Sequence, residues 1–483
     1  MSAFEAVIGL EVHVQLRTRT KLFCACPNAY GLAPNSATCP VCLGLPGALP
    51  VLNREAVAQA LRLGRALEAR LQPRSDFYRK QYFYADLPKG YQITQGPVAL
   101  VEGGVLRLPG DPAVRGPEGP LACGITRAHL EEDAGKSHHD LQPGATLVDL
   151  NRAGVPLVEI VGEPDLRSPL EAMHYLQALH RLVVFLGICD GNLEEGSFRC
   201  DANVSLRPAG TSAFGTRVEV KNLNSFNNVR RALSYEIARQ GELLGRGEAV
   251  VAETRGWDAD RGETRVQRAK ERAHDYRFFP EPDLPALALD LATFDLGLPE
   301  LPEAKAARYR AEAGLGEAEA LTLLQSPAFS AAYETVARTS GSPRAAAAWM
   351  LGEVSRWLNE RGERPEAYPV PAEVLGALVA LVESKVITHG TAKEQVLPAL
   401  MAGERDPGAY VAAHGLAQVA DPGAIRDLVD QVLAAHPEPV AQLRAGGKAS
   451  LRGFLVGQVL KAGGGRLDPK GVNEALDAAL AGS

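Results

Sequence analysis

Residues 8–16 read IGLEVHVQL, and this stretch decides the fold class of the first half of the chain. Its apolar and polar residues alternate one by one, with Leu10, Val12, Val14 and Leu16 against Glu11, His13 and Gln15. Strict alternation predicts a β-strand with one buried face. The other face carries an acid, an imidazole and an amide instead of the Lys, Thr and Ser of a solvated strand. We therefore expect this strand to serve a site.

Two further stretches repeat the pattern, SFRCDANVSL (197–206) and TRVEVKN (216–222). In one antiparallel sheet, their polar faces would join Glu11 and His13 with a mixed set of charges: Arg199, Asp201, Glu219 and Lys221. Three ordinary solvated strands are the alternative, which each strand alone would favour. The agreement of all three favours a common site for a metal and an anion.

A carboxylate also stands inside an apolar run, where Glu159 interrupts VPLVEIVG (155–162). An unpaired buried carboxylate costs several kcal/mol, so Glu159 needs a partner. A predicted loop in HLEEDAGKS (129–137) supplies three more acids, Glu131, Glu132 and Asp133. Oxygen ligands favour magnesium, but the imidazole of His13 suits manganese or zinc equally well. Ligand type alone leaves the ion open.

One segment is suited to phosphate binding, KNLNSFNNVRRALSYEIARQ (221–240). Lys221 and Asn222 end a predicted strand, and Asn224 or Ser225 caps a helix whose free N–H groups attract anions. A plain helix cap is the alternative. The stretch DAGKS (133–137) resembles a phosphate-binding loop, but Leu130 stands where that motif requires glycine, which excludes it.

Four of the seven cysteines form a spaced set, Cys24, Cys26, Cys39 and Cys42. The spacing C-x-C-x12-C-x2-C supplies four thiolates for a tetrahedral structural zinc with a closed ligand shell. Reduced cysteines without metal are the alternative. The remaining three are expected to be lone core residues: Cys123, Cys189 and Cys200.

The chain is too long, at 483 residues, for a single core. A Pro-rich tract at 278–303 opens an Ala/Leu/Glu/Arg-rich region, and a helical pattern stops near 401–410. We predict domains at 1–293, 294–407 and 408–483. Mixed strands and helices without regular alternation favour an α+β fold in the first domain and helices in the others.

Three helix starts and one excursion are predicted. Ser168 caps a helix with Glu171 completing a capping box, and helices begin at Ser342-Pro343 and Asp468-Pro469. The last helix should bury a stripe of Val472, Leu476 and Leu480. The Gly/Pro-rich stretch 101–130 is expected to form a hairpin excursion.

Composition restricts the protein class. The net charge of −7 gives no general attraction to nucleic acid, so such contacts require local basic patches. The odd cysteine count favours a reducing compartment, and no apolar run approaches the roughly 18 residues of a membrane span. We therefore predict a cytoplasmic protein.

A basic set occupies the C-terminal stretch 446–471: Lys448, Arg452, Lys461, Arg466 and Lys470. A small helical bundle with an incidentally basic surface is the alternative to a nucleic-acid contact.

Eight motifs in order resemble the B subunits of glutamyl/aspartyl-tRNA amidotransferases: IGLEVHVQL, the cysteine set, DLPKGYQITQ, HLEEDAGKS, VDLNRAGVPLVEIV, LEEGSFRCDANVS, EVKNLNSFNNV and DYRFFPEPD. The resemblance covers about the first 290 residues and continues more thinly to the C-terminal stretch. It implies an antiparallel-sheet cradle domain similar to glutamine synthetase, a helical domain and a tRNA-contacting helical tail.

The resemblance also implies the activity. ATP would phosphorylate the side-chain carboxylate of Glu-tRNA(Gln), Asp-tRNA(Asn) or both, and ammonia from an amidase A subunit would displace the phosphate. A small C subunit completes the heterotrimer, and the misacylating aminoacyl-tRNA synthetase is a further expected partner. A ligase acting on a free amino acid and a non-catalytic tRNA-binding scaffold are the alternatives.

Site residues follow from the motif positions. The resemblance implies that His13, Glu131 and Glu159 hold magnesium, with Glu11 beside them. Three acids would serve an ATP-bound metal or the ammonia passage: Glu132, Asp201 and Glu219. Lys89 resembles a lysine lining that passage. Our choices for phosphate contact are Arg199, Asn203, Lys221 and Asn222, and the basic C-terminal set is assigned to the tRNA backbone.

Overall fold

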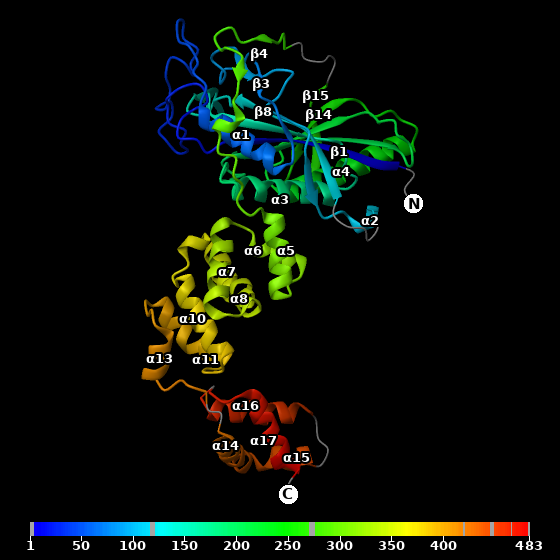
Figure 1. Ribbon diagram of the computed structural model, residues 1–483. Coiled ribbons are helices and arrows are strands. Elements are labelled where there is room, and N and C mark those ends of the chain that lie inside the picture. Colours follow the sequence, from blue (N-terminus) through cyan, green and yellow to red (C-terminus); the bar gives the residue numbers. More distant parts are fainter. Residues whose placement is uncertain are drawn as a thin grey trace. The chain divides into compact units, whose positions relative to one another are not determined.

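The computed structural model describes residues 4–115, 121–269, 276–418, 421–444, 449–464 and 466–481. Internal contacts divide the chain into two compact units, residues 1–302 and 303–483 (Figure 1). The first unit contains a large sheet, and the described elements of the second are all helical. The protein is thus α+β with its helical region at the C-terminal end, as the sequence predicts.

One sheet of 13 strands organises the first unit, with the order β15-β14-β13-β12-β1-β11-β8-β5-β4-β16. Its strands in chain order are β1 (Phe4–Gln15), β4 (Phe77–Gln81), β5 (Tyr91–Gln95), β8 (Leu121–Glu132), β11 (Pro156–Gly162), β12 (Phe198–Pro208), β13 (Val218–Lys221), β14 (Glu253–Asp258), β15 (Glu263–Ala269) and β16 (Phe279–Pro280). Off this path lie β2 (Arg70–Leu71), β6 (Val101–Glu102) and β7 (Val105–Leu108). All pairings are antiparallel except β13 with β14.

Two strand pairs stand outside this sheet: β9 (Lys136–Gln142) with β10 (Ala145–Asp149), and β3 (Arg74–Ser75) with β17 (Leu287–Ala288). In the stretch 101–130, β7 and β8 pair as neighbouring antiparallel strands, which confirms the predicted hairpin. Residues 116–120 within it lie outside the described residues. A short helix, α2 (Pro112–Arg115), follows β7.

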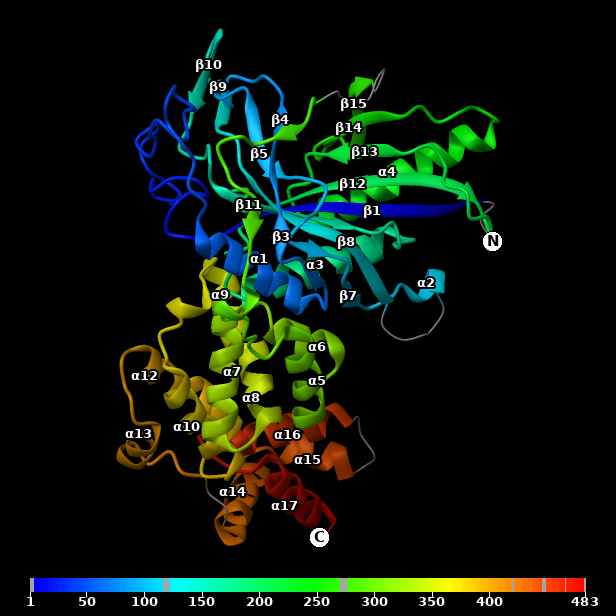
Figure 2. The ribbon, with the colours of Figure 1, turned by 45° about the horizontal axis from the view of Figure 1, so that its top comes forward.

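Helices cover one face of the sheet and leave the other to polar residues. α3 (Pro169–Phe185) and α4 (Phe226–Gly245) pack against each other and share a core with β1 and β12, while α1 (Arg54–Ala66) packs against β8 (Figures 1 and 2). Leu10, Val12 and Val14 of β1 are at most 1% exposed. The alternation in residues 8–16 therefore predicted the buried face correctly.

The pairing register aligns the polar residues across the sheet centre. His13 lies opposite Glu159 on β11 and opposite Arg199 on β12. Glu159 in turn lies opposite His129 on β8. A register shift between Val161 and Gly162 follows only after these pairs. Directly opposed residues of antiparallel strands point to the same face, so the register gathers these side chains.

The predicted start of α3 is half correct. Ser168 is its N-cap and accepts a hydrogen bond from the backbone N–H of Glu171 at 3.2 Å. The capping box is wrong, because the Glu171 carboxylate accepts the N–H of Arg167 at 2.7 Å and pairs with Arg115. Glu171 is fully buried, so an arginine gives its charge better compensation than a lone backbone donor.

The second unit is built of helices, after a 3-10 turn at Leu291–Thr293 that closes the first unit. They are α5 (Pro302–Ala313), α6 (Glu317–Leu323), α7 (Pro327–Ser340), α8 (Pro343–Trp349), α9 (Ser355–Arg361), α10 (Ala372–Glu383), α11 (His389–Thr391), α12 (Leu397–Met401), α13 (Pro407–Ala413), α14 (Pro422–Ala435), α15 (Pro437–Arg444), α16 (Ala449–Ala462) and α17 (Pro469–Ala481). A 3-10 turn lies at Pro365–Ala367, and π-helical turns join α8 to α9 and α11 to α12.

Both predicted helix starts in this unit are confirmed, and Val472 and Leu476 are buried with Leu480 packed against them. A search of the described helices finds none with the length and apolar character needed to span a bilayer.

Candidate active site

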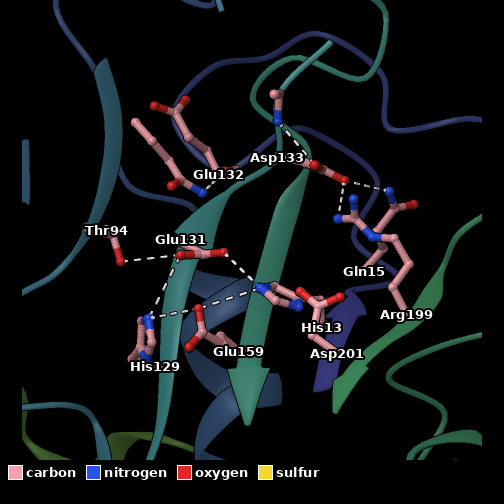
Figure 3. A network of polar contacts seen from close by, with 12 residues as sticks. His13, Gln15, Thr94, His129, Glu131, Glu132, Asp133, Glu159, Arg199 and Asp201 are labelled. Atoms are coloured by element: carbon pink, nitrogen blue, oxygen red, sulfur yellow. Dashed lines mark hydrogen bonds and ion pairs between the residues drawn. The ribbon is translucent and has the colours of Figure 1, made fainter. Parts of the chain in front are cut away.

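Three ligand-type side chains meet at the centre of the polar face. The Nε2 atom of His13 lies 3.4 Å from a Glu159 oxygen and 3.7 Å from a Glu131 oxygen (Figure 3). One ligand atom from each of the three falls within 4.8 Å of the others, a spacing suited to one metal ion. The strands β1, β8 and β11 thus bring together the predicted triad.

The charges of the triad depend on each other. Burial alone raises the pKa of Glu159, but contact with His13 and the charges of His129 and His13 lower it to about 2. Burial alone lowers the pKa of His13, whereas Glu159 and Glu131 raise it. Glu159 is thus held as a carboxylate, the form that binds a divalent cation.

His129 is a site residue that sequence reasoning missed. Its Nε2 atom lies 3.7 Å from oxygens of both Glu131 and Glu159, and its ring is 6% exposed. Thr94 donates a hydrogen bond at 3.3 Å to the same Glu131 oxygen that His129 approaches. The signal was available, because His129 stands two residues before Glu131 and alternate residues of a strand share a face.

The predicted acid loop is wrong in part, since Glu131 and Glu132 are the last two residues of β8. Neighbouring strand residues point to opposite faces, so only Glu131 joins the triad. Glu132 instead pairs with Lys89 and accepts the N–H of Ile93 at 2.9 Å. Lys89 and Glu132 line one pocket together with Cys42.

Asp133 forms a buried ionic group next to the triad. Its carboxylate accepts hydrogen bonds from Gln15 and Arg199, both at 2.8 Å, and Arg152 lies 3.7 Å away. Burial raises the pKa of Asp133, but these two arginines and Gln15 lower it overall. Arg199 thus lies beside the triad, and Asp133 balances its charge. The buried Nε atom of Arg199 has no hydrogen-bond partner among the described residues.

The other predicted acids form a third group on β1, β12 and β13. Lys221 pairs with Asp201 at 2.7 Å and with Glu219 at 3.2 Å. Glu11 accepts a hydrogen bond from Asn203 at 3.0 Å. Burial and the charges of Glu159 and Asp201 raise the pKa of Glu11. The structure therefore brings these residues onto the polar face next to the triad, but Glu132 lies apart from them.

The helix start predicted after Lys221 and Asn222 is present. Ser225 rather than Asn224 is the N-cap of α4 and accepts the N–H of Asn228 at 3.1 Å. Asn222 adopts a left-handed backbone conformation, with φ of 63°, at the turn after β13. Lys221 and Asn222 thus stand between the polar face and the start of α4.

The four predicted zinc ligands also converge. One sulfur from each of the four cysteines lies within 4.8 Å of the others: Cys24, Cys26, Cys39 and Cys42. Four thiols at this spacing fit a tetrahedral zinc. The pKa of Cys42 is lowered to about 4, first by contact with Cys24 and further by the charge of Lys21. The three other cysteines are buried and free, as predicted.

A buried lysine supports this cluster. Lys21 is fully buried, and its ammonium donates to the Ala37 carbonyl at 2.8 Å and contacts the Cys42 sulfur at 3.8 Å. Four thiolates around a divalent zinc carry net negative charge, which a nearby ammonium offsets. No sequence pattern indicates this role, because Lys21 lies outside the cysteine spacing.

Two residues of the basic C-terminal set have partners within the second unit. Arg452 on α16 pairs with Asp477 on α17 at 2.8 Å, and Arg466 donates to the Gly415 carbonyl at 3.1 Å. Lys461 and Lys470 are exposed. Lys448 lies outside the described residues.

Comparisons with known proteins agree with this architecture. A family model described as "GatB/GatE catalytic domain" matches residues 6–295, and one described as "GatB domain" matches residues 331–480. A protein of Halorhodospira halophila is 52% identical over 484 aligned residues, covering 99% of this chain and all of the relative. One of Geobacter sulfurreducens is 49% identical with the same coverage, and one of Alkalilimnicola ehrlichii is 51% identical over 98% of both chains. Each of these relatives is named as the B subunit of an aspartyl/glutamyl-tRNA(Asn/Gln) amidotransferase.

Proposed function

The chain belongs to the family of aspartyl/glutamyl-tRNA(Asn/Gln) amidotransferase B subunits, and from this premise we propose that its first unit carries the ATP-dependent amidation itself. The protein is a subunit of a ligase complex that amidates misacylated tRNA. The observation that supports a catalytic role is the convergence of His13, Glu131 and Glu159 on the polar face. Three ligands, unlike the four of the cysteine set, leave coordination positions open for substrate oxygens, as a catalytic metal site requires.

The reaction needs activation because a side-chain carboxylate is a poor electrophile. Its negative charge repels a nucleophile, and oxide is a poor leaving group. Transfer of the γ-phosphoryl group of ATP to the carboxylate gives an acyl phosphate and ADP. Attack by ammonia then forms the C–N bond and releases phosphate. Both steps develop negative charge on oxygen, so fixed cations stabilise their transition states.

The polar face supplies these charges at defined places. His13, Glu131 and Glu159 would hold a magnesium ion, which when bound neutralises developing charge on phosphoryl oxygens. Arg199 and Lys221 lie on the strands beside the triad, each held by acids. We propose that they contact the phosphates of ATP, assisted by Asn203, Asn222 and the free N–H groups at the start of α4.

Ammonia must reach the acyl phosphate unprotonated, which favours a shielded route. The Lys89–Glu132 pair faces away from the triad and lines a pocket beside the cysteine cluster. We propose that this pair borders the ammonia route, whereas Glu11, Asp201 and Glu219 stay with the nucleotide. The amidase A subunit would supply the ammonia, and a small C subunit would complete the complex.

We propose that residues 1–293 form a cradle domain similar in fold to glutamine synthetase. The cysteine cluster would bind structural zinc. Residues 294–407 would form a helical domain, and residues 408–483 a tail that contacts the tRNA backbone through its basic residues. A cytoplasmic location and contact with the misacylating synthetase follow from the same role in translation.

The deciding experiment is amidation by the reconstituted complex with ATP, glutamine and each misacylated tRNA. We expect amide formation and phosphate release to occur together with Glu-tRNA(Gln), Asp-tRNA(Asn) or both. Free glutamate and free aspartate serve as acceptor controls, because amidation of either would support the ligase alternative. Phosphate release that does not depend on aminoacyl-tRNA would contradict the proposal.

A further inference from the structure

A group of aromatic side chains lies at the surface of the first unit at the end of β4. It consists of Tyr82, Phe83, Tyr84, Tyr276 and Phe278, of which Tyr82 and Tyr276 are half-buried, and we call it the aromatic platform. Phe83 is 80% exposed and Tyr84 64% exposed. Rings at this exposure have no core to stabilise, and a contiguous exposed patch of this kind marks a binding surface.

The platform has ordered geometry. The Tyr82 ring lies 5.9 Å from that of Tyr84 and 6.5 Å from that of Tyr276, and Tyr276 lies 5.9 Å from Phe278. Four of its rings, those of Tyr82, Phe83, Tyr84 and Tyr276, line a surface pocket of about 640 Å³ together with Arg277. Rings held nearly perpendicular to one another leave faces open for a planar ligand to stack on.

Two distant segments are fixed together to build it. The N–H of Gln81, the last residue of β4, donates to the Tyr276 carbonyl at 2.9 Å. Glu281 is buried and binds Arg79 of β4 through two hydrogen bonds, at 2.7 and 2.8 Å. The segment YRFFPEPD (276–283), for which the amidation chemistry gives no role, is thus anchored to β4 through Glu281 and presents its aromatic residues beside Tyr82.

The strand that leads into the platform, β4, shares one face of the sheet with the triad. In the β4–β5 pairing, Tyr78 lies opposite Thr94, whose hydroxyl contacts Glu131, so alternate residues Tyr78 and Lys80 share the face of Glu131. The Lys80 ammonium lies 5.0 Å from the Tyr276 ring centre. Lys80 therefore lies against the rings on the face of the sheet that carries Glu131.

We propose that the aromatic platform binds the unpaired 3′-terminal nucleotides of the aminoacyl-tRNA and thereby positions the esterified amino acid over the triad. This inference rests on the proposed function. Stacking on aromatic rings with nearby cations is the general way in which proteins hold single-stranded nucleic acid without reading its sequence. Lys80 and Arg277 supply cations next to the rings, and the ester lies on the terminal ribose of the stacked strand. The aminoacyl group must therefore be presented close to the bases that the platform holds.

The test uses the complete heterotrimer and the double variant Phe83→Ala/Tyr84→Ala. The probes are uncharged tRNA with an intact 3′ end and the same tRNA trimmed of its 3′-terminal unpaired nucleotides. We expect the variant to bind intact tRNA roughly tenfold more weakly or worse, because base stacking on aromatic rings accounts for about this much affinity per base. Binding of trimmed tRNA should be almost unchanged. In amidation assays KM for the misacylated tRNA should rise more than kcat falls.

Two controls make the result specific. Phe214→Ala removes another exposed aromatic ring in the connection between β12 and β13 and should leave both binding constants unchanged. Phe83→Tyr/Tyr84→Phe keeps two rings and should restore tight binding. Equal losses for intact and trimmed tRNA, or no loss for either, would overturn the proposal. Loss of the amidase subunit from the complex with normal tRNA binding would overturn it too, and would assign the platform to an interface between subunits.

The outcome is separable from the proposed function, because the binding measurements need neither ATP nor glutamine. A wild-type complex that discriminates intact from trimmed tRNA through these rings, yet performs no amidation, would leave the platform standing and overturn the proposed function. If the wild-type complex amidates and the double variant binds intact tRNA as tightly as the wild type does, the platform proposal is overturned and the proposed function stands.

Discussion

The first unit contains two ligand clusters of opposite character. His13, Glu131 and Glu159 offer an imidazole and two oxygens from three central strands, and three ligands leave coordination positions open. The cysteine set offers four sulfurs and closes the shell of a tetrahedral ion. The difference separates a cluster that can receive substrate oxygens from one that can only hold the chain together.

The two clusters are nevertheless built alike in one respect, since each has a buried basic residue beside it. Lys21 contacts the Cys42 sulfur, and His129 approaches both carboxylates of the triad. Backbone hydrogen bonds also connect the two clusters, from Leu22 to the Gly154 carbonyl and from Gly154 to the Asp133 carbonyl, each at 2.9 Å. Because only the triad leaves coordination positions open, variants of the triad should lower the amidation rate, and variants of the cysteine set should lower stability.

The largest effect should come from Glu159→Gln. The amide keeps the shape but loses the charge that holds the cation, and a metal contributes several kcal/mol to transition-state stabilisation, so amidation should fall about a thousandfold. Glu163→Gln, just beyond the end of β11, is the matched control. The rate of tRNA-dependent phosphate release measures the effect, and full activity in the Glu159 variant would remove this residue from the site.

Cys42→Ser should act on stability rather than chemistry. Loss of one thiolate weakens zinc binding, and because the binding energy of a structural zinc is folding energy, the first unit should melt at a lower temperature. Zinc content and thermal unfolding measure this. Cys123→Ala, which removes a buried thiol outside the cluster, should keep its zinc. A Cys42 variant with full zinc content and unchanged melting would contradict a structural role.

His129→Gln should have a smaller effect on amidation, about 10- to 100-fold, as is typical when a residue that orients metal ligands is replaced. Glu131 and Glu159 would keep their positions less firmly, so the magnesium concentration for half-maximal activity should rise. Magnesium titration of the amidation rate distinguishes this from general destabilisation. An unchanged titration with a lower melting temperature would make His129 a packing residue only.

The smallest effect should come from a carboxylate without any ligand role, Glu334 in the second unit. It accepts hydrogen bonds from Lys305 at 2.6 Å and Tyr309 at 2.9 Å. Burial raises its pKa, but Lys305, Arg308 and Tyr309 lower it overall. A lowered pKa contributes stability above the unfolded-state value, and this contribution is lost as the pH falls through the folded-state value.

Glu334→Gln should therefore destabilise the protein by about 1 kcal/mol at neutral pH and by less in acid. Chemical unfolding at pH 7 and below pH 4 checks this, and Glu366→Gln, at an exposed position of the same unit, is the control. Equal destabilisation at both pH values would show that the ionic contacts are not its source.

Local patterns in the sequence predicted most of the fold and many of the site residues. Alternation identified the buried face of β1, and the cysteine spacing identified four side chains that converge. The errors arose where a partner distant in sequence decides. Glu171 pairs with Arg115 instead of completing a capping box, and Glu132, which strand alternation turns away from Glu131, pairs with the distant Lys89. Such pairings depend on tertiary contacts that no local period contains.

His129 illustrates the intermediate case. Taking HLEED as a loop hid the alternation that links His129 with Glu131, because the strand ends two residues later than its apolar content suggests. The aromatic platform could not be predicted from local patterns either. Tyr82 and Tyr276 are almost 200 positions apart in the sequence, and a hydrogen bond from Gln81 of β4 to Tyr276 holds the two segments together.

The register shift between Val161 and Gly162 determines where the chain can change length. Before it, a single inserted or deleted residue in β1 or β11 would turn His13 or Glu159 toward the hydrophobic core and destroy the triad in one step. After it, the pairing with β8 has already slipped by one position, and an additional residue there alters no ligand. Indels accepted during divergence or engineering should therefore fall beyond residue 161 rather than between 157 and 161.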